Sequence, residues 1–229
     1  MKERPVIFNS EMVRAILSGG KRQTRRVMKP QVHSMARFAD YKTDLGYPTS
    51  KTHLWAGFYL TEDSETPGYY KCPYGKIGDR LWVRETWSTD ADIEAYRKAN
   101  EPVPIVYKGD WDIDGITKEE ACDVGIIWKP SIFMPRWASR IDLEITDIGV
   151  ERVQDIKEKD CEAEGIEVAE SIGDYAGALW TARTKKATFS FSDAQSAFQY
   201  LWDSINAKRG YGWDSNPWVW IIMFKRVIQ

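Results

Sequence analysis

The pattern of apolar and polar positions predicts more strands than helices. Residues 140–147 alternate apolar and charged side chains, which is typical of a strand with one face in a core. Residues 5–8 form a short apolar run, and residues 217–224 are apolar at nearly every position, as in a strand covered on both faces. Residues 194–205 carry apolar side chains at helical spacing, and Gly210 ends that helix. Because helices and strands do not alternate regularly, we expect an α+β fold in which a small curved sheet or barrel is flanked by helices.

The first predicted helix is followed by an unusual concentration of reactive and charged groups. Asn9 or Ser10 can cap a helix over residues 12–17, which the pair Gly19-Gly20 ends. Lys21, Arg22, Gln23, Thr24, Arg25 and Arg26 then follow. Thr24 is a candidate nucleophile, Lys21 a candidate base, and the three arginines favour an anionic ligand. A solvated basic turn is the alternative.

The geometry of this stretch decides between the two interpretations. Side chains three positions apart in a regular strand point to opposite faces. Lys21 and Thr24 can therefore meet only if residues 21–24 curl, which the double glycine before them permits.

Two glutamates occupy positions that local physics disfavours. Glu85 shares the predicted strand face of Leu81 and Val83, so it either pairs with a buried cation, such as an arginine, or lies where the strand leaves the core. Glu164 ends a short helix that a capping box at Asp155 predicts, and there its charge faces the negative end of the helix dipole. That position raises its proton affinity, but placement alone favours an ordinary acidic surface, because Glu158, Glu162, Glu167 and Glu170 lie nearby in the sequence.

Three segments are predicted to be insertions around the core. Residues 30–75 contain scattered proline, glycine and tyrosine and suggest a loop with one strand near 54–60. Residues 88–128 suggest helices over 90–99 and 117–124 and a strand over 103–107, and residues 168–190 suggest a loop.

Composition narrows the possible classes. The 229 residues are 43% hydrophobic and include 11 Trp, which predicts a folded chain, and a net charge of −2 leaves nucleic-acid contact to a local patch. With 3 Cys at unrelated spacings and 2 His, neither a disulfide framework nor a metal site is expected, and no dinucleotide, P-loop or GxSxG motif predicts a cofactor. No apolar run suggests a signal peptide or membrane span, so we expect a soluble cytoplasmic protein without a membrane partner.

Several phrases together resemble the ASCH domain family, whose β-barrel is related to the PUA domain. They are residues 17–26, 78–83 and 219–227, and the longer phrases 78–87, 134–140 and 212–218 are similar to its phage- and prophage-encoded branch. The resemblance covers about half of the chain and implies one PUA-like domain over residues 1–229, with mostly antiparallel strands and the three insertions.

The resemblance also implies a function. A compact bacterial member removes the acetyl group from acetylcytidine, and its functional lysine, threonine and glutamate match Lys21, Thr24 and Glu164. The implied activity is a metal-independent amidohydrolase acting on an acylated cytidine, with oxyanion donors near Gly19-Gly20. Candidate substrate-binding residues are Arg22, Arg25, Arg26, Trp82 and Glu85.

Two alternatives belong to other classes of protein. One is a non-catalytic module for RNA or modified nucleotides, in which the basic residues contact phosphate and Trp82, Trp87 or Trp180 stacks on a base. The other is a phage accessory factor whose insertions bind a protein partner.

Overall fold

A computed structural model describes most of the chain. The described residues are 1–32, 36–42, 55–59, 67–89, 98–99, 101–111, 126–169, 179–184 and 187–228. The helix predicted over 117–124, and the predicted helix over 90–99 except for its last two residues, lie outside these ranges.

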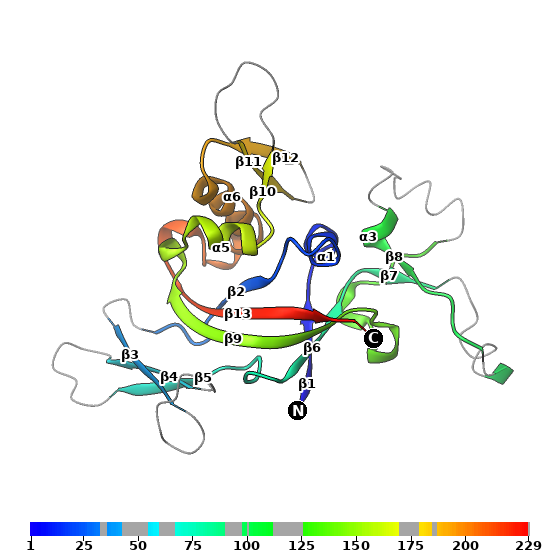
Figure 1. Ribbon diagram of the computed structural model, residues 1–229, viewed down its shortest axis with the longest axis horizontal. Coiled ribbons are helices and arrows are strands. Elements are labelled where there is room, and N and C mark those ends of the chain that lie inside the picture. Colours follow the sequence, from blue (N-terminus) through cyan, green and yellow to red (C-terminus); the bar gives the residue numbers. More distant parts are fainter. Residues whose placement is uncertain are drawn as a thin grey trace.

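A five-stranded sheet forms the centre of the molecule (Figure 1). Its order is β1, β6, β9, β13, β2, with bounds Glu3–Ile7, Arg80–Arg84, Asp142–Arg152, Trp218–Val227 and Gln23–Val27. The β1–β6 pair is parallel, whereas the other three pairs are antiparallel. The α+β class and the mostly antiparallel sheet are therefore confirmed.

The two long strands follow the predicted patterns in part. In β9, Leu143 and Ile145 are fully buried, as the alternation predicts. In β13, Val219 packs in the cluster around α6 (Ala194–Asn206), whereas Ile222 packs in the main core, so the first half of this strand is covered on both faces. Its later half is not, because Met223 is 36% exposed. The prediction of a strand covered on both faces over 217–224 was therefore wrong at Met223, whereas Phe224, on the other side of the bulge, is buried.

The sheet curves but does not close into a backbone-bonded barrel among the described strands. Its edge strands, β1 and β2, are not paired with each other. A side chain spans the gap, since Arg26 Nη2 of β2 donates to the Ile7 carbonyl of β1 at 2.7 Å. The Lys2 carbonyl accepts from Arg80 and the Phe8 N–H donates to Arg84, so the even-numbered residues of β1 bond to β6. The backbone groups of Glu3, Pro5 and Ile7 therefore point away from the sheet. Pro5, which lacks an N–H, thus occupies a position that an edge strand tolerates.

Helices cover one side of the sheet near β2 (Figure 1). They are α1 (Ser10–Leu17), α5 (Glu158–Ala163) and α6, and α3 (Lys108–Trp111) packs against α1. Short 3₁₀ turns span Ser131–Phe133, Arg136–Ala138, Val153–Asp155, Ala207–Arg209 and Trp213–Ser215. No helix in the described ranges has the length and apolar character needed to cross a bilayer.

Helix caps were predicted with mixed success. The Asn9 side chain accepts from the Met12 N–H at 2.9 Å, which confirms the first cap, and Gly210 ends the last helical turn with φ +80°. The sequence Ser192-x-x-Gln195 predicts a capping box at the start of α6, but the observed cap is Asp193, whose carboxylate accepts from the Ser196 N–H at 2.7 Å. The capping box at Asp155 was wrong, since this residue lies in a 3₁₀ turn and α5 begins at Glu158.

The predicted insertions contain more strands than expected. A second sheet consists of β3 (Arg37–Lys42), β4 (Trp55–Tyr59) and β5 (Gly68–Lys71), and a third of β10 (Glu167–Ala169), β11 (Leu179–Arg183) and β12 (Thr188–Phe191). The short pair β7 (Trp87–Ser88) and β8 (Val106–Tyr107) confirms part of the strand predicted over 103–107. The strand predicted near 54–60 is confirmed by β4, whereas the loop predictions were wrong at the other strands of these two sheets. Aromatic contacts such as Phe58 with Trp218, at 4.8 Å between ring centroids, anchor the segment around β4 to the core.

Candidate functional site

The end of α5 docks directly onto the chain that leads into β2. The Arg22 N–H donates to the Ala163 carbonyl at 2.8 Å. Gly165, which follows the helix with φ +94°, permits this approach, because a Cβ there would lie 3.2 Å from Ala15 Cβ and 3.4 Å from Lys21 Cβ. The docking places Glu164 against Lys21, although 143 positions separate them in the sequence.

Lys21 and Glu164 form a buried ion pair. Lys21 Nζ donates to the Glu164 carboxylate at 2.7 Å and to the Glu164 main-chain carbonyl at 2.6 Å. Their side chains are 0% and 4% exposed. The lysine ammonium thus neutralises both the carboxylate and an orphan carbonyl at the helix C-terminus, where a cation is favourable. This contact explains how the disfavoured position of Glu164 is tolerated.

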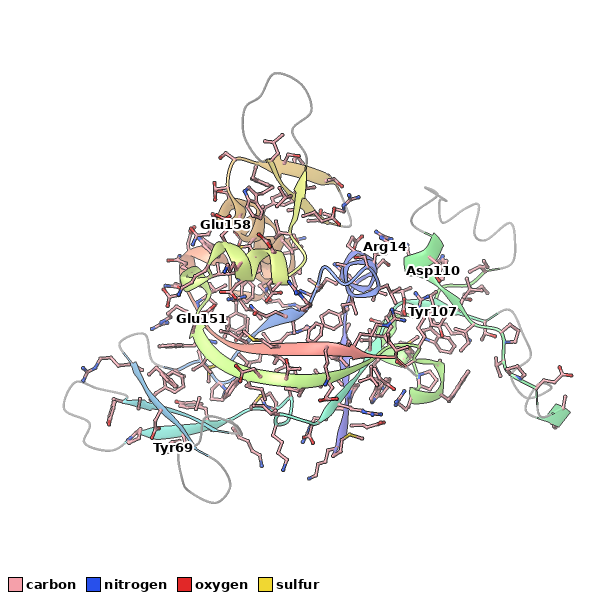
Figure 2. All side chains as sticks on the ribbon, viewed as in Figure 1. Arg14, Tyr69, Tyr107, Asp110, Glu151 and Glu158 are labelled. Carbon is pink, nitrogen blue, oxygen red and sulfur yellow. The ribbon has the colours of Figure 1, made fainter. Side chains whose placement is uncertain are left out.

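Arg25 joins the same network from the other side. Its Nε donates to Glu151 at 2.7 Å, and its Nη1 donates to Glu164 at 3.3 Å. Asp160 lies 3.5 Å from Arg25 Nη2. Figure 2 shows Glu151 on β9 near α5, so three elements contribute to the network. Within the described ranges, no group of three or more His, Cys, Asp or Glu side chains is arranged to hold a metal ion.

Burial and the surrounding charges act on the proton affinity of Lys21 in opposite directions. Burial lowers the pKa of Lys21 below its ordinary value of 10.5, and the charges of Arg26 and Arg25 lower it further, whereas Glu164 opposes the change. Burial also raises the pKa of Glu151, against the effect of Arg25. The site therefore favours a neutral lysine more than water does, as a general base requires.

Thr24 and Arg26 lie on one face of β2, because two positions separate them. Lys21 Nζ and Arg26 Cζ both lie over the Phe8 ring, at 5.9 and 5.0 Å from its centroid. A regular strand would send positions 21 and 26 to opposite faces, so the chain curls before β2 begins at Gln23. Among the described contacts, however, Lys21 Nζ donates to Glu164 and not to the Thr24 hydroxyl. Proton transfer from Thr24 to Lys21 stays a prediction.

A cavity of about 360 Å³ lies beside β2 and the C-terminal half of α6. Thr24, Arg25, Arg26 and Glu164 line the cavity. Lys21 does not line it but bonds to Glu164, which does. The other lining residues are Met12, Val27, Lys29, Pro73, Tyr74, Phe198, Leu201, Trp202, Ile205, Asn206, Arg209 and Tyr211. The volume is in the range of small-molecule sites, and the lining combines apolar walls with a few polar groups, as such sites do.

The other predicted substrate-binding residues do not line this cavity. Arg22 is exposed, and Trp82 is buried with Arg84 Cζ 4.7 Å from its ring centroid. Glu85 accepts two hydrogen bonds from Arg140, at 2.9 and 3.0 Å, which confirms the alternative of a buried pair with an arginine.

Glu85 and the tryptophans proposed for stacking belong to other parts of the fold. The partners of Arg140 include Tyr107 and Asp110, which lie on the far side of α1 from Glu151 in Figure 2. Trp87 and Trp180 are buried in separate hydrophobic clusters, and neither lines the cavity, although the cluster of Trp180 also contains the lining residues Phe198, Leu201 and Trp202. Within the described residues, the aromatic side chains at the cavity are therefore Tyr74, Phe198, Trp202 and Tyr211.

Several site residues were missed at the level of sequence. Glu151 lies beyond the strand predicted over 140–147, and Tyr74 lies in a segment without any local signal. A positive charge such as Arg209 just before the helix-ending Gly210 suits the helix dipole, so it gave no separate signal of a site. Gly165 carried a usable signal, because a glycine after Glu164 marks the left-handed turn that lets the helix end approach Lys21.

Comparisons with known proteins give no family assignment: no family model matches the chain, and no curated protein or solved structure matches it significantly. The resemblance to the ASCH family accordingly stays a hypothesis.

Proposed function

We propose that this chain is an amidohydrolase of the ASCH type that removes an acyl group from a modified cytidine. The observation that carries the proposal is the buried Lys21–Glu164 pair, with its 2.7 Å contact, at the wall of a cavity that Thr24 also lines. A hydroxyl, an amine of lowered pKa and a carboxylate are the groups that acyl transfer through a covalent intermediate uses.

The proposed reaction has two balanced steps. Thr24 Oγ attacks the acyl carbonyl carbon and gives its proton to neutral Lys21 Nζ. The C–N bond then breaks, and the nucleoside amine leaves with that proton, which produces a threonine ester. Water next attacks the ester carbonyl and gives a proton to Lys21. Lys21 passes this proton to Thr24 Oγ as the ester C–O bond breaks, which releases the carboxylic acid and regenerates Thr24 and neutral Lys21. Glu164 orients Lys21 and stabilises its charged form in both steps.

The oxyanion donors expected near Gly19-Gly20 are largely occupied. The Gly19 N–H donates to Ile16, and the Lys21 N–H to Ala15. A better donor is the Arg25 N–H. The Arg22 carbonyl accepts from the Phe224 N–H, and the Met28 N–H donates to the Trp218 carbonyl, so the even-numbered residues of β2 bond to β13. The backbone groups of the odd-numbered residues, including Arg25, therefore point away from β13. This N–H directly follows the proposed nucleophile and faces the open edge of the sheet, so we assign it to the tetrahedral oxyanion.

A substrate panel tests the proposal. The purified protein is incubated with N4-acylcytidines of increasing acyl length, with O-acylated controls, and with unacylated cytidine. Chromatography should show release of cytidine and the free acid from the N4-acylated compounds. If none of the acylated nucleosides or nucleotides is hydrolysed over a broad pH range, the hydrolase proposal is wrong.

The rate should depend on pH through Lys21. Since neutral Lys21 is the base, kcat/KM is expected to rise with pH, with a midpoint below 10.5 because the pKa of Lys21 is lowered. Arg26→Gln removes a positive charge that lowers this pKa, so the midpoint should move to higher pH. The matched control is Arg22→Gln, since Arg22 is exposed and its charge does not contribute to the pKa change. A profile with the same midpoint in all three proteins would exclude Lys21 as the base.

A second candidate function is binding of RNA or a modified nucleotide without catalysis. The observation in its favour is that four cations line the cavity: Arg25, Arg26, Lys29 and Arg209. Binding through several phosphates weakens steeply with salt, whereas turnover of a neutral nucleoside does not. Salt-sensitive binding without hydrolysis in the panel would favour this candidate.

A further inference from the structure

The cavity contains more positive charge than its own carboxylates neutralise. Arg25 is paired with Glu151, Asp160 and Glu164, and Glu164 is paired with Lys21 as well. The remaining cations at the lining are Arg26, Lys29 and Arg209. Among the described contacts, none of these three lies within ion-pair distance of a carboxylate.

The contacts of these cations are with neutral groups. The guanidinium of Arg26 donates to the Ile7 carbonyl and lies over the Phe8 ring, and its Nε is buried without a hydrogen-bond partner. Lys29 Nζ lies 5.5 Å from the centroid of the Tyr211 ring. Arg209 follows α6 in an exposed 3₁₀ turn.

Two of these positive charges, Arg26 and Arg209, lie close enough to interact. Burial lowers the pKa of Arg26, and the nearby charge of Arg209 lowers it further, although Tyr74 and Glu164 oppose the change. Cations that repel one another at a cavity without paired carboxylates are stabilised when an anion binds between them.

We propose that the cavity binds a nucleotide with a 5′-phosphate, and that Arg26, Lys29 and Arg209 hold the phosphate. This inference rests on the proposed function for the nature of the base, which would lie between the apolar walls near Thr24. Lys29 and Arg209 are exposed at the rim of the cavity. Arg26 is half-buried on the same face of β2 as Thr24, so it would neutralise the phosphate charge from the inner side. At about 360 Å³ the cavity suits one nucleotide better than a stretch of RNA.

Isothermal titration calorimetry with cytidine 5′-monophosphate, cytidine and inorganic phosphate tests this inference. The monophosphate should bind at least about tenfold more tightly than cytidine, because charge-assisted hydrogen bonds are the strong ones. The double variant Lys29→Gln/Arg209→Gln should weaken binding of the monophosphate by at least about tenfold and that of cytidine by less than about twofold. The matched control is Lys208→Gln, a neighbouring exposed cation that does not line the cavity.

Equal affinities for cytidine and its monophosphate, or an unchanged affinity in the double variant, would overturn the inference. If a short single-stranded RNA bound tenfold or more tightly than cytidine 5′-monophosphate, the choice of a mononucleotide would be overturned. The two proposals fail separately. Hydrolysis of acylated cytidine without a preference for the phosphate overturns the phosphate site alone, whereas the expected binding pattern without any hydrolysis supports the site and overturns the hydrolase.

Discussion

Thr24→Val is expected to abolish hydrolysis of an acylated cytidine while the protein stays folded. Valine keeps the branched shape that a strand residue needs but removes the hydroxyl that attacks the acyl carbonyl. Loss of the nucleophile should lower kcat by at least about 10³-fold. Any remaining rate would come from substrate binding and the oxyanion donor. Initial rates at saturating substrate, together with circular dichroism of the variant, measure both parts of the expectation.

Two further measurements separate a nucleophile from a structural residue at position 24. Thr24→Ser keeps the hydroxyl and should keep much of the activity. Rapid acid quenching of the wild-type reaction, followed by peptide mass spectrometry, should find the acyl group on the peptide that contains Thr24. Undiminished hydrolysis by Thr24→Val would refute the assignment, even if the enzyme activity itself is established.

Glu164→Ala is expected to destabilise the protein more than any exposed substitution nearby. Removal of the carboxylate leaves the Lys21 ammonium buried without its countercharge, and Arg25 loses one of its partners. Breaking a buried ion pair by removing one member lowers the free energy of unfolding by about 3–5 kcal/mol. Urea denaturation measures this loss without reference to any activity.

The controls for Glu164→Ala come from the same helix and the same pair. Glu162→Ala removes an exposed carboxylate of α5 and should change stability by less than about 0.5 kcal/mol. The double variant Lys21→Met/Glu164→Gln removes both charges of the pair. Its loss of stability should therefore be smaller than the sum of the losses in Lys21→Met and Glu164→Gln. Additive losses would show that the two side chains do not depend on each other.

Much of the fold could be predicted where one periodic pattern extended over a whole element. Alternation in β9 and the apolar face of α6 depend on local sequence and burial, and both were found. Sheet pairing could not be predicted in this way, because the parallel contact of β1 with β6 joins residues far apart in sequence. The strand β4 was predicted, but its neighbours β3 and β5 were missed, because glycine, proline and tyrosine in this segment weaken the local pattern and their pairing with β4 is a tertiary contact.

The candidate site was predictable to the extent that its residues violate local rules. Glu164 at a helix end and Glu85 on an apolar face both required a cation, and the structure supplies Lys21 and Arg140. Which cation pairs with which carboxylate depends on tertiary contacts, such as the docking of α5 on residue 22, and no local pattern shows those contacts. Arg209 near a helix end and Lys29 in a surface turn are ordinary positions for cations, so the sequence does not mark them as site residues. Only the cavity that both line does so.

The unclosed sheet has a consequence for association between molecules. Exposed edge strands invite pairing with other chains, and proteins protect them in several ways. Here β1 carries Pro5 on its outer side, and the outermost carbonyl of Ile7 already accepts from Arg26. The same guanidinium that we place near a bound phosphate therefore also blocks the template for strand addition. Loss of Arg26 would leave the Ile7 carbonyl at the edge of β1 without this partner, so a tendency to self-associate through that edge would accompany any loss of binding.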